Sequence, residues 1–229
     1  MKKQHRFLVA EIPTSERFSI SEKELVHLIR TVLKIAPGES CRLFSSNSDD
    51  LSVKVVSVDK DSVIFEKITI EPKVQIPITV TAALSITKRD TFEMMVQKLT
   101  ELGVHTILPI ISDRTIKQAL RLDRLQKISD EAMEQSGHSQ RVLVCEPKTL
   151  EVILVDNRDI KSFYFDTDTK ESLSKDGGPV LFYVGPEGGW SDREKELFKI
   201  HGVSPATLGN TVLRAETAAI VATYTLIWQ

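Results

Sequence analysis

The most informative stretch of this chain is Val184-Gly185-Pro186-Glu187-Gly188-Gly189-Trp190-Ser191. It completes an apolar run, Val180–Val184, which is typical of a buried strand. Glycines let the backbone approach a ligand closely and offer it bare N–H and C=O groups. They are equally typical of a tight strand-to-helix turn, and the loop alone does not choose between the two interpretations. Ser191 and Glu194 have the spacing of a capping box, which predicts that a helix begins here.

Glycines gather late in the chain. Seven of the ten lie between Gly177 and Gly209. A dinucleotide-binding fold would place its glycine-rich turn just after the first strand of the domain. Here that strand runs into Thr87-Lys88-Arg89-Asp90, and a Gly-x-x-x-x-Gly-Lys phosphate loop is also absent from the sequence. The distribution argues against the common nucleotide-binding folds and predicts a ligand held by late loops.

A second late loop, Leu208–Leu213, leads into Arg214-Ala215-Glu216-Thr217 and then into a nearly all-apolar helix, Ile220–Trp228. Glu216 near a helix start is favourable for the helix dipole, which is enough to explain it. Arg214 opposes the same dipole. A role in binding a ligand or RNA is therefore the better interpretation of Arg214.

Beyond residue 73 the chain alternates strands and helices, which predicts an α/β domain with a mostly parallel sheet covered by helices. The predicted strands are Val80–Ile86, Thr106–Ile111, Val142–Cys145, Ser162–Phe165, Val180–Val184 and Ala206–Leu208. Apolar stripes at helical spacing run from Phe92 to Leu102 and from Leu122 to Ala132. We expect Asp90 and Glu93 to cap the first of these helices and Gly103 to end it.

Residues 1–72 have a mostly β pattern. The predicted strands are Phe7–Ile12, Cys41–Phe44, Leu51–Val58 and Val63–Ile70, with turns at Asn47–Asp50 and Asp59–Asp61. A helix over Glu22–Lys34, capped by Ser21 and ended by Ala36-Pro37-Gly38, interrupts them. A small barrel with one inserted helix fits this order. Glu71-Pro72-Lys73 is the predicted linker, which gives domains at 1–72 and 73–229.

Composition excludes some classes of protein. Hydrophobic residues make up 41% of the chain and the net charge is −2, so any RNA must be bound by local basic patches. Cys41 and Cys145 lie far apart in apolar stretches, which favours two small buried side chains over a metal site or a disulfide. No run reaches membrane-spanning length. We expect a cytoplasmic protein without a bound metal.

Together these segments resemble the family of bacterial small-subunit ribosomal RNA methyltransferases that modify uridine at N3, in the knotted SPOUT class. The matching segments are Lys98–Val104 with Pro109, Glu134-Gln135-Ser136-Gly137, Gly185–Gly189, Leu208-Gly209 and Leu213–Ala218. His27–Arg30 through Pro37-Gly38 also looks like the small PUA-like barrel of the family. One departure is His138, where the family usually has Arg; Arg141 is close enough in sequence to substitute.

The resemblance implies a SPOUT methyltransferase domain with a C-terminal trefoil knot, a rare exception to ordinary chain connectivity. It also implies a homodimer, a 16S ribosomal RNA substrate within the small ribosomal subunit, and S-adenosylmethionine as cofactor. The expected cofactor-binding residues are Gly185, Pro186, Glu187, Gly188, Gly189, Leu208, Gly209, Leu213 and Thr217. The expected RNA-binding residues are Arg6, Arg30, Lys88, Glu134, Gln135 and Arg141.

The implied reaction suggests roles for two residues. Uridine N3 carries a proton and lies on the Watson–Crick edge, so the base must be splayed out and lose that proton before it can accept a methyl group. Arg214 is the expected cation beside the uracil carbonyl oxygens. Glu216 either accepts the proton or orients Arg214. Both are therefore predicted catalytic residues.

Two other classes of function remain open at this point. A non-catalytic RNA-binding factor could retain the fold, although the intact Gly185–Gly189 and Leu208–Thr217 segments speak against it. An unrelated hydrolase or kinase would need a phosphate loop, a nucleophile elbow or a metal cluster, and the sequence has none of them. Affinity for S-adenosylmethionine separates the three interpretations.

Overall fold

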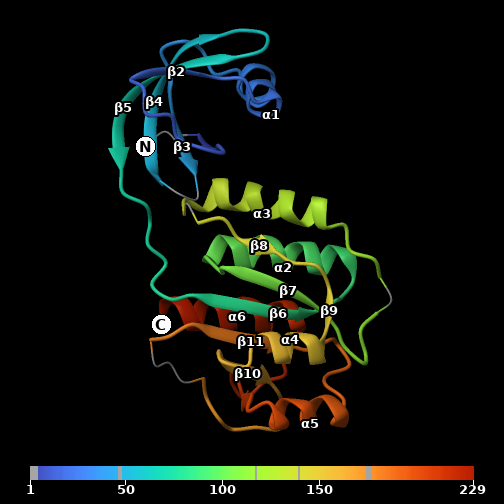
Figure 1. Ribbon diagram of the computed structural model, residues 1–229. Coiled ribbons are helices and arrows are strands. Elements are labelled where there is room, and N and C mark those ends of the chain that lie inside the picture. The colour runs from blue at the N-terminus through green and yellow to red at the C-terminus, as the bar shows by residue number, and fades with distance from the viewer. Residues whose placement is uncertain (1–4, 46–47, 117, 139, 174–176) are drawn as a thin grey trace. The chain divides into compact units, whose positions relative to one another are not determined.

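The computed structural model describes residues 5–45, 48–116, 118–138, 140–173 and 177–229, and the chain divides into two compact units (Figure 1). The first comprises residues 1–75 and 137–141. The second comprises residues 76–136 and 142–229.

The first unit is built on one five-stranded sheet. Its strands are β1 (Arg6–Leu8), β2 (Arg17–Ile20), β3 (Ser40–Ser45), β4 (Ser48–Val58) and β5 (Val63–Glu71), in the order β1-β3-β4-β5-β2. β1 runs parallel to β3, and the other pairs are antiparallel. Helix α1 (Lys23–His27) continues into a π-helical turn, Leu28–Val32, and buries Leu25 and Ile29 in the core. This β-rich unit fits the expected PUA-like arrangement.

Several predictions for the first unit were wrong in detail. The first strand ends at Leu8 rather than Ile12, and β2 was not predicted because only Phe18 and Ile20 carry its apolar pattern. Ser48–Asp50 belongs to β4 and not to a turn, while residues 46–47 lie outside the described residues. Ser21 does not cap α1, whose N-cap is Glu22 without a side-chain hydrogen bond.

The second unit contains a seven-stranded parallel sheet, as the alternating pattern predicted. Its strands are β6 (Val80–Ser85), β7 (Thr106–Ile111), β8 (Leu143–Val144), β9 (Lys148–Thr149), β10 (Lys161–Phe165), β11 (Val180–Val184) and β12 (Ser204–Ala206). The order is β12-β10-β11-β6-β7-β8, and β9 also pairs with β7. Every pair is parallel. The central strands β6 and β11 are almost entirely buried, as sheets covered on both faces require.

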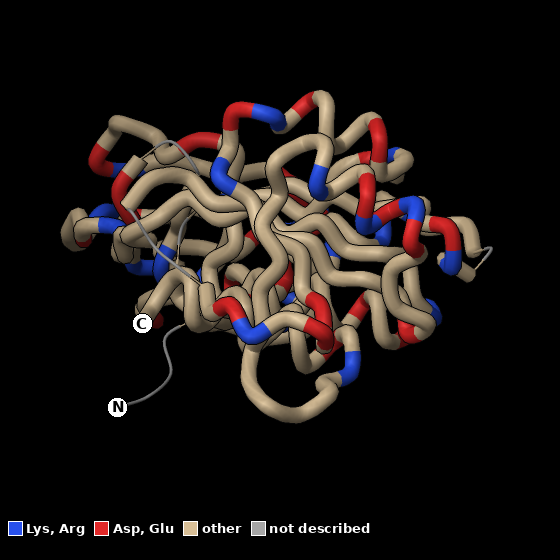
Figure 2. Tube along the Cα trace, turned by 90° about the horizontal axis from the view of Figure 1, so that it is seen from below, with Lys and Arg blue, Asp and Glu red and all other residues tan. Residues whose placement is uncertain are grey.

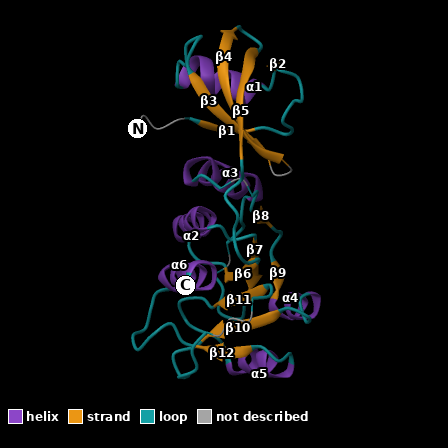
Figure 3. Ribbon diagram, turned by 90° about the vertical axis from the view of Figure 1, so that its left-hand side faces the viewer, coloured by secondary structure: helices purple, strands orange, loops and turns teal. Residues whose placement is uncertain are grey.

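Helices cover both faces of this sheet (Figure 3). The helices are α2 (Arg89–Leu102), α3 (Leu122–Ser136), α4 (Leu150–Asp156), α5 (Asp192–Ile200) and α6 (Ala215–Trp228). One apolar cluster joins α2, α3 and α6 to residues such as Ala82 and Phe182, and another joins α4 and α5 to Ala83 and Tyr183. Neighbouring residues of one strand therefore bury their side chains on opposite faces of the sheet, because side chains alternate in direction along a β-strand.

Local details of the second unit differ from expectation at a few positions. Gly103 ends α2 with a φ of +96°, as predicted. The predicted Asp90/Glu93 cap was wrong, because the N-cap is Lys88 and the Glu93 carboxylate instead accepts from Arg124 at 2.6 and 2.7 Å. Helix α4 and the two-residue β9 were not predicted, because both are too short to give a clear period. Cys41 is buried, whereas Cys145 is only half-buried.

Candidate functional site

Both glycine loops leave the sheet of the second unit at the same edge. Because the strands are parallel, their carboxyl ends share one edge. β11 ends at Val184, directly before the first loop, and β12 ends at Ala206, shortly before the second. β10 lies between these two strands in the sheet. Open α/β sheets bind their ligands at this edge, outside the carboxyl ends of the strands.

Two glycines of the first loop have structural reasons of their own. A Cβ on Gly185 would stand 3.0 Å from Cε2 of Trp190, whose buried indole donates to the Phe165 carbonyl at 3.2 Å. Gly189 has a φ of +68°, and its N–H closes a turn on the Pro186 carbonyl at 2.9 Å. The tight-turn interpretation therefore holds at these positions. Beside Gly189 the place of a Cβ is nevertheless open space, which a ligand can use.

The helix after this loop begins at the predicted capping box. Ser191 Oγ accepts the Glu194 N–H at 3.2 Å, and the Glu194 carboxylate accepts the Ser191 N–H at 2.8 Å. The same carboxylate is fully buried and also accepts the Asp113 N–H at 2.9 Å. One side chain thus ties the glycine loop to the turn that follows β7.

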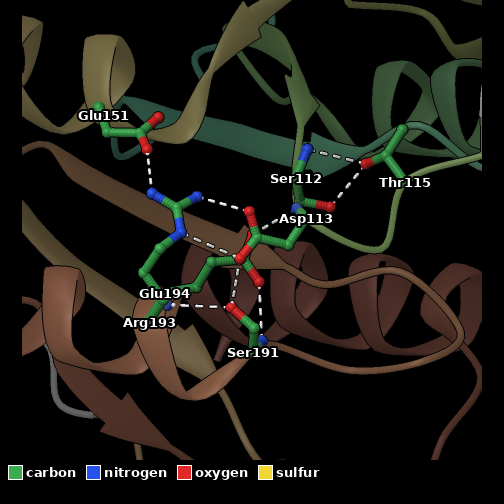
Figure 4. A network of polar contacts seen from close by, with 7 residues as sticks. All are labelled: Ser112, Asp113, Thr115, Glu151, Ser191, Arg193 and Glu194. Carbon is green, nitrogen blue, oxygen red and sulfur yellow. Dashed lines mark hydrogen bonds and ion pairs between the residues drawn. The ribbon is translucent and has the colours of Figure 1, made fainter.

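Figure 4 shows the polar network around that turn. Arg193 donates to Asp113 through Nε at 3.1 Å and through Nη2, and to Glu151 of α4 through Nη1. Ser191 Oγ also donates to Asp113. The hydrogen bond from Arg193, and then that from Ser191, lowers the pKa of the Asp113 carboxyl, and Arg193 likewise lowers the pKa of Glu151. At neutral pH this ionised network fixes the turn after β7 against α4 and α5.

The second loop is held by its own backbone and by the chain before it. Thr207 Oγ1 donates to the Gly209 carbonyl at 2.8 Å, and the Thr207 N–H donates to the Glu171 carbonyl at 2.8 Å. Gly209 has a φ of +138°, and the place of a Cβ there is open space. Leu208 and Leu213 are half-buried against the core. The loop combines exposed backbone with an apolar floor.

The predicted catalytic pair lies directly after this loop. Arg214 is the N-cap residue of α6, with an exposed side chain that makes no capping hydrogen bond. Glu216 is half-buried in the first turn, and Thr217 is exposed. Among the described residues no ion pair joins Arg214 to Glu216. Arg214 and Glu216 therefore lie directly after the second glycine loop and do not form an ion pair with each other.

Two buried hydroxyls mark the end of the central strand β6. Ser85 is 1% exposed and Thr87 is fully buried, and neither hydroxyl has a hydrogen-bond partner in the described part of the chain. A buried polar group without a partner costs about 1–3 kcal/mol. Leu84 is in register with Val184, so these hydroxyls lie at the edge where the first glycine loop begins. They are candidate ligand-binding groups that the sequence did not reveal.

One predicted RNA-binding residue has an internal role. Arg6 pairs with Asp50 at 2.8 Å, with only 9% and 4% of the two side chains exposed, and its guanidinium lies 4.4 Å from the ring centre of Phe44. A side chain committed in this way is not displayed for a phosphate. We therefore do not retain Arg6 as a candidate RNA contact.

The other predicted RNA-binding residues are placed on several elements. Arg30 is exposed on the π-helical turn of the first unit, and Arg141 is exposed in the segment 137–141. Lys88 is exposed at the N-terminus of α2, while half-buried Glu134 and exposed Gln135 lie in the last turn of α3. Arg30 and Arg141 belong to the first unit, and Lys88, Glu134 and Gln135 belong to the second.

Sequence reasoning missed the turn after β7. Asp113 and Arg114 follow β7 after one intervening residue, and the carboxyl-edge rule of parallel sheets would have placed them at the same edge as the first glycine loop. Their partners could not have been found, because Asp113 and Ser191 lie 78 positions apart. Within the described residues, no group of His, Cys, Asp and Glu side chains could hold a metal ion, and no helix is long and apolar enough to span a membrane.

Comparison with known proteins gives consistent similarities. The family model described as an RNA methyltransferase domain matches residues 74–227. The ribosomal RNA small subunit methyltransferase E of Rickettsia conorii is 25% identical, over 97% of this chain and 94% of the relative. That of Bacillus subtilis is 28% identical, over 96% and 92%. The solved structure of the Neisseria gonorrhoeae ribosomal RNA small subunit methyltransferase E, bound to S-adenosylmethionine, is 27% identical with a TM-score of 0.90, over 97% of this chain and 96% of that one.

Proposed function

Because the chain belongs to the family of RNA methyltransferase domains, we propose that it transfers a methyl group from S-adenosylmethionine to N3 of a uridine in 16S ribosomal RNA. The observation that carries the proposal is the meeting of two glycine loops at one carboxyl edge of a parallel sheet. The full-length similarity to small-subunit ribosomal RNA methyltransferases supports the choice of substrate.

The residues at this edge fit the proposed cofactor. The open space beside Gly189 and Gly209 leaves room where any other residue would carry a Cβ. The half-buried Leu208 and Leu213 offer an apolar surface for an adenine ring. The rest of the set in this proposal is Gly185, Pro186, Glu187, Gly188 and Thr217. The buried hydroxyls of Ser85 and Thr87 add unsatisfied polar groups at the same edge.

When bound, the cofactor supplies a methyl group activated by its sulfonium. The chain must hold the uracil base in line with that group and remove the N3 proton, since positioning supplies much of the rate of such a displacement. In our proposal Glu216 accepts the proton and the exposed Arg214 guanidinium stabilises the negative charge on the uracil carbonyl oxygens. Their place at the N-terminus of α6, next to the second loop, supports these roles.

RNA docking is assigned to the N-terminal part of the chain together with a few residues of the catalytic part. We infer a PUA-like domain at 1–72 and a SPOUT domain at 73–229. Arg30, Lys88, Glu134, Gln135 and Arg141 remain the candidate contacts. Figure 2 shows basic and acidic residues interspersed along the trace, and the balanced charge disfavours tight capture of bare RNA by electrostatics alone. A folded substrate, the assembled small subunit in the cytoplasm, suits scattered contacts better.

A homodimer is the proposed assembly. Helix α6 is nearly all apolar after its first turn, and its buried residues pack on α2, β6 and β11 of the same chain. Tyr224 and Trp228 remain 46% exposed on it. A second copy of this chain would cover these residues. The trefoil knot also stays a prediction, in keeping with a last helix that returns from the edge strand β12 to the centre of the sheet.

The proposed activity is tested by incubating the protein with cofactor and three substrates at equal concentration: small subunits, protein-free 16S RNA and a short uridine-containing strand. A methyl group at N3 blocks base pairing, so reverse transcription should stop at one uridine in the small subunits. Methylation at another atom, or none in any substrate, would contradict the proposal. Equal methylation of the short strand would contradict only the requirement for a folded substrate.

A further inference from the structure

Arg114 lies against Gly188 in the first glycine loop. Its Nη1 donates a hydrogen bond to the Gly188 carbonyl, although the two residues are 74 positions apart. A Cβ on Gly188 would stand 3.3 Å from Cδ of Arg114. Gly188 does not have a positive φ, so its backbone conformation does not require glycine. A Cβ at this position would instead require the Arg114 side chain to shift by a few tenths of an ångström.

With this contact, both polar groups of one peptide unit form hydrogen bonds within the protein. The peptide between Gly188 and Gly189 donates its N–H to the Pro186 carbonyl at 2.9 Å, and its C=O accepts from Arg114. A peptide held at both ends cannot rotate without breaking one of two hydrogen bonds. Since one of them comes from a charged donor, it is stronger than a neutral hydrogen bond.

The turn that carries Arg114 is itself fixed. The Ser112 N–H donates to Thr115 Oγ1 at 2.8 Å, and Glu194 accepts the Asp113 N–H. Arg193 and Ser191 bind the Asp113 side chain. A side chain as exposed as that of Arg114 would ordinarily lose much entropy in one geometry. Because the backbone of this turn is already fixed by hydrogen bonds, ordering the Arg114 side chain costs less conformational entropy.

We propose that Arg114 is a positioning residue of the cofactor site, which sets the first glycine loop in its binding conformation by holding the Gly188 carbonyl. This inference rests on the proposed function. It assigns Arg114 to the protein's own backbone and not to the RNA. A direct contact between Arg114 and a phosphate is the competing interpretation, which the experiment separates.

The test is a double-mutant cycle on the full-length protein, measured as the dissociation constant for S-adenosylmethionine by calorimetry. Arg114→Ala should raise it about tenfold, which is the loss of one useful contact, and Arg114→Lys should restore part of the affinity. Gly188→Ala should raise it about threefold by displacing the Arg114 side chain. In the Arg114→Ala protein Gly188→Ala should add nothing, because the new Cβ then meets only an ordinary contact at 3.7 Å.

Arg158→Ala is the matched control, since Arg158 is also exposed and pairs only loosely with Asp159 at 3.7 Å. It should leave the affinity unchanged. The unfolding midpoints of Arg114→Ala and Arg158→Ala should be equal. A loss of cofactor affinity in Arg114→Ala would then reflect the position of the loop and not a loss of stability of the whole protein. In a Trp228→Phe background, the emission of Trp190 without cofactor should shift on Arg114→Ala, because it then reports this loop alone.

Each other result has a clear meaning. If wild-type protein binds the cofactor and Arg114→Ala binds it equally well, the positioning role is overturned while the proposed function stands. A raised KM for small subunits in that case would assign Arg114 to RNA. Fully additive effects of the two substitutions would also overturn the proposal. A folded wild-type protein with no affinity for the cofactor would overturn both this inference and the proposed function.

Discussion

At the scale of single residues, one Cβ or one dihedral angle decides which residue type is suitable. Gly185 leaves room for Trp190, Gly188 leaves room for Arg114, and Gly189 has a positive φ. The three glycines of this loop, which the sequence suggests are one ligand-binding motif, therefore each have a different local structural role. Room for a ligand is an additional property of Gly189 and not the reason for every glycine.

Lys34 is the opposite case, because a residue with a Cβ occupies a backbone conformation that favours glycine. It has a φ of +53°, the only positive value at a non-glycine residue in the described ranges. It follows Leu33, the C-cap of the π-helical turn, whose N–H donates to the Leu28 carbonyl at 2.9 Å. The left-handed region costs a residue with a Cβ about 1–2 kcal/mol.

We expect Lys34→Gly to raise the free energy of unfolding of the first unit by about 0.5–1 kcal/mol, the left-handed cost less the entropy that glycine loses. Urea denaturation measures the change. Lys60→Gly is the control, since Lys60 lies in the β4–β5 turn without a positive φ. Destabilisation by both substitutions would contradict the assignment of strain to Lys34.

At the scale of elements, the polar network of Asp113, Ser191 and Arg193 joins loops that local sequence cannot pair. Because Arg193 and Ser191 lower the pKa of Asp113, the folded state binds a proton there less readily than the unfolded chain. The resulting stabilisation is present above the ordinary aspartate pKa of about 3.9 and is lost as pH falls through the lower folded value.

Asp113→Asn removes this charge and keeps the backbone N–H that Glu194 accepts. At pH 7 we expect the melting temperature to fall by about 2 °C, since exposed ion pairs contribute little and a domain of this size shifts modestly. Below pH 4 the difference between the two proteins should begin to narrow, because Asp113 then takes up a proton in the unfolded chain, and it should be lost as pH falls through the lower folded pKa. Thermal melts at pH 7, 5 and 3.5 measure it, and a constant difference would contradict the role of Asp113.

The elements also show how far sequence reaches. The Ser191/Glu194 box and the Gly103 end of α2 were predicted correctly, because a cap depends on residues three or four positions apart. The parallel sheet and the family resemblance were likewise confirmed. The long-range partners of Glu194 and Gly188 were not predictable from sequence. They are Asp113 and Arg114, which follow strand β7 and come near the first glycine loop only in the folded chain.

Arg6 illustrates the same limit in the first unit. In sequence it reads as one of several basic residues suited to phosphate, and only the fold reveals Asp50 and Phe44 around it. Charge on a side chain can be counted from sequence, whereas its exposure cannot. The remaining candidate site residues, including Arg214 and Glu216, stay predictions.

At the scale of the whole molecule, RNA docking and cofactor binding should be separable. We expect Arg30→Glu to weaken binding to small subunits and to lower the slope of log affinity against log salt by about one, as loss of one phosphate contact does. Affinity for S-adenosylmethionine should not change. Lys60→Glu makes the same charge change in the same unit and should have a smaller effect. Equal effects would mean that charge alone, and not position, governs docking.

Assembly belongs to the same scale. Tyr224→Glu places a charge on the exposed part of α6, and we expect it to convert a dimer into monomers in sedimentation at micromolar concentration, because burying an unpaired charge is costly. Val152→Glu, at an exposed apolar residue of α4, is the control and should remain dimeric. A wild-type protein that sediments as a monomer would contradict the proposed dimer.

The central claim is that the two late loops form a site for S-adenosylmethionine, and calorimetric titration of the folded wild-type protein with this cofactor tests it most directly. We predict saturable binding at one site per chain. Affinity should be lost when Gly209 is replaced by Val, because Val strains the backbone at a φ of +138° and its side chain enters the open space at the Cβ position. The absence of binding heat and of competition by S-adenosylhomocysteine, in protein shown to be folded by its melting transition, would contradict it.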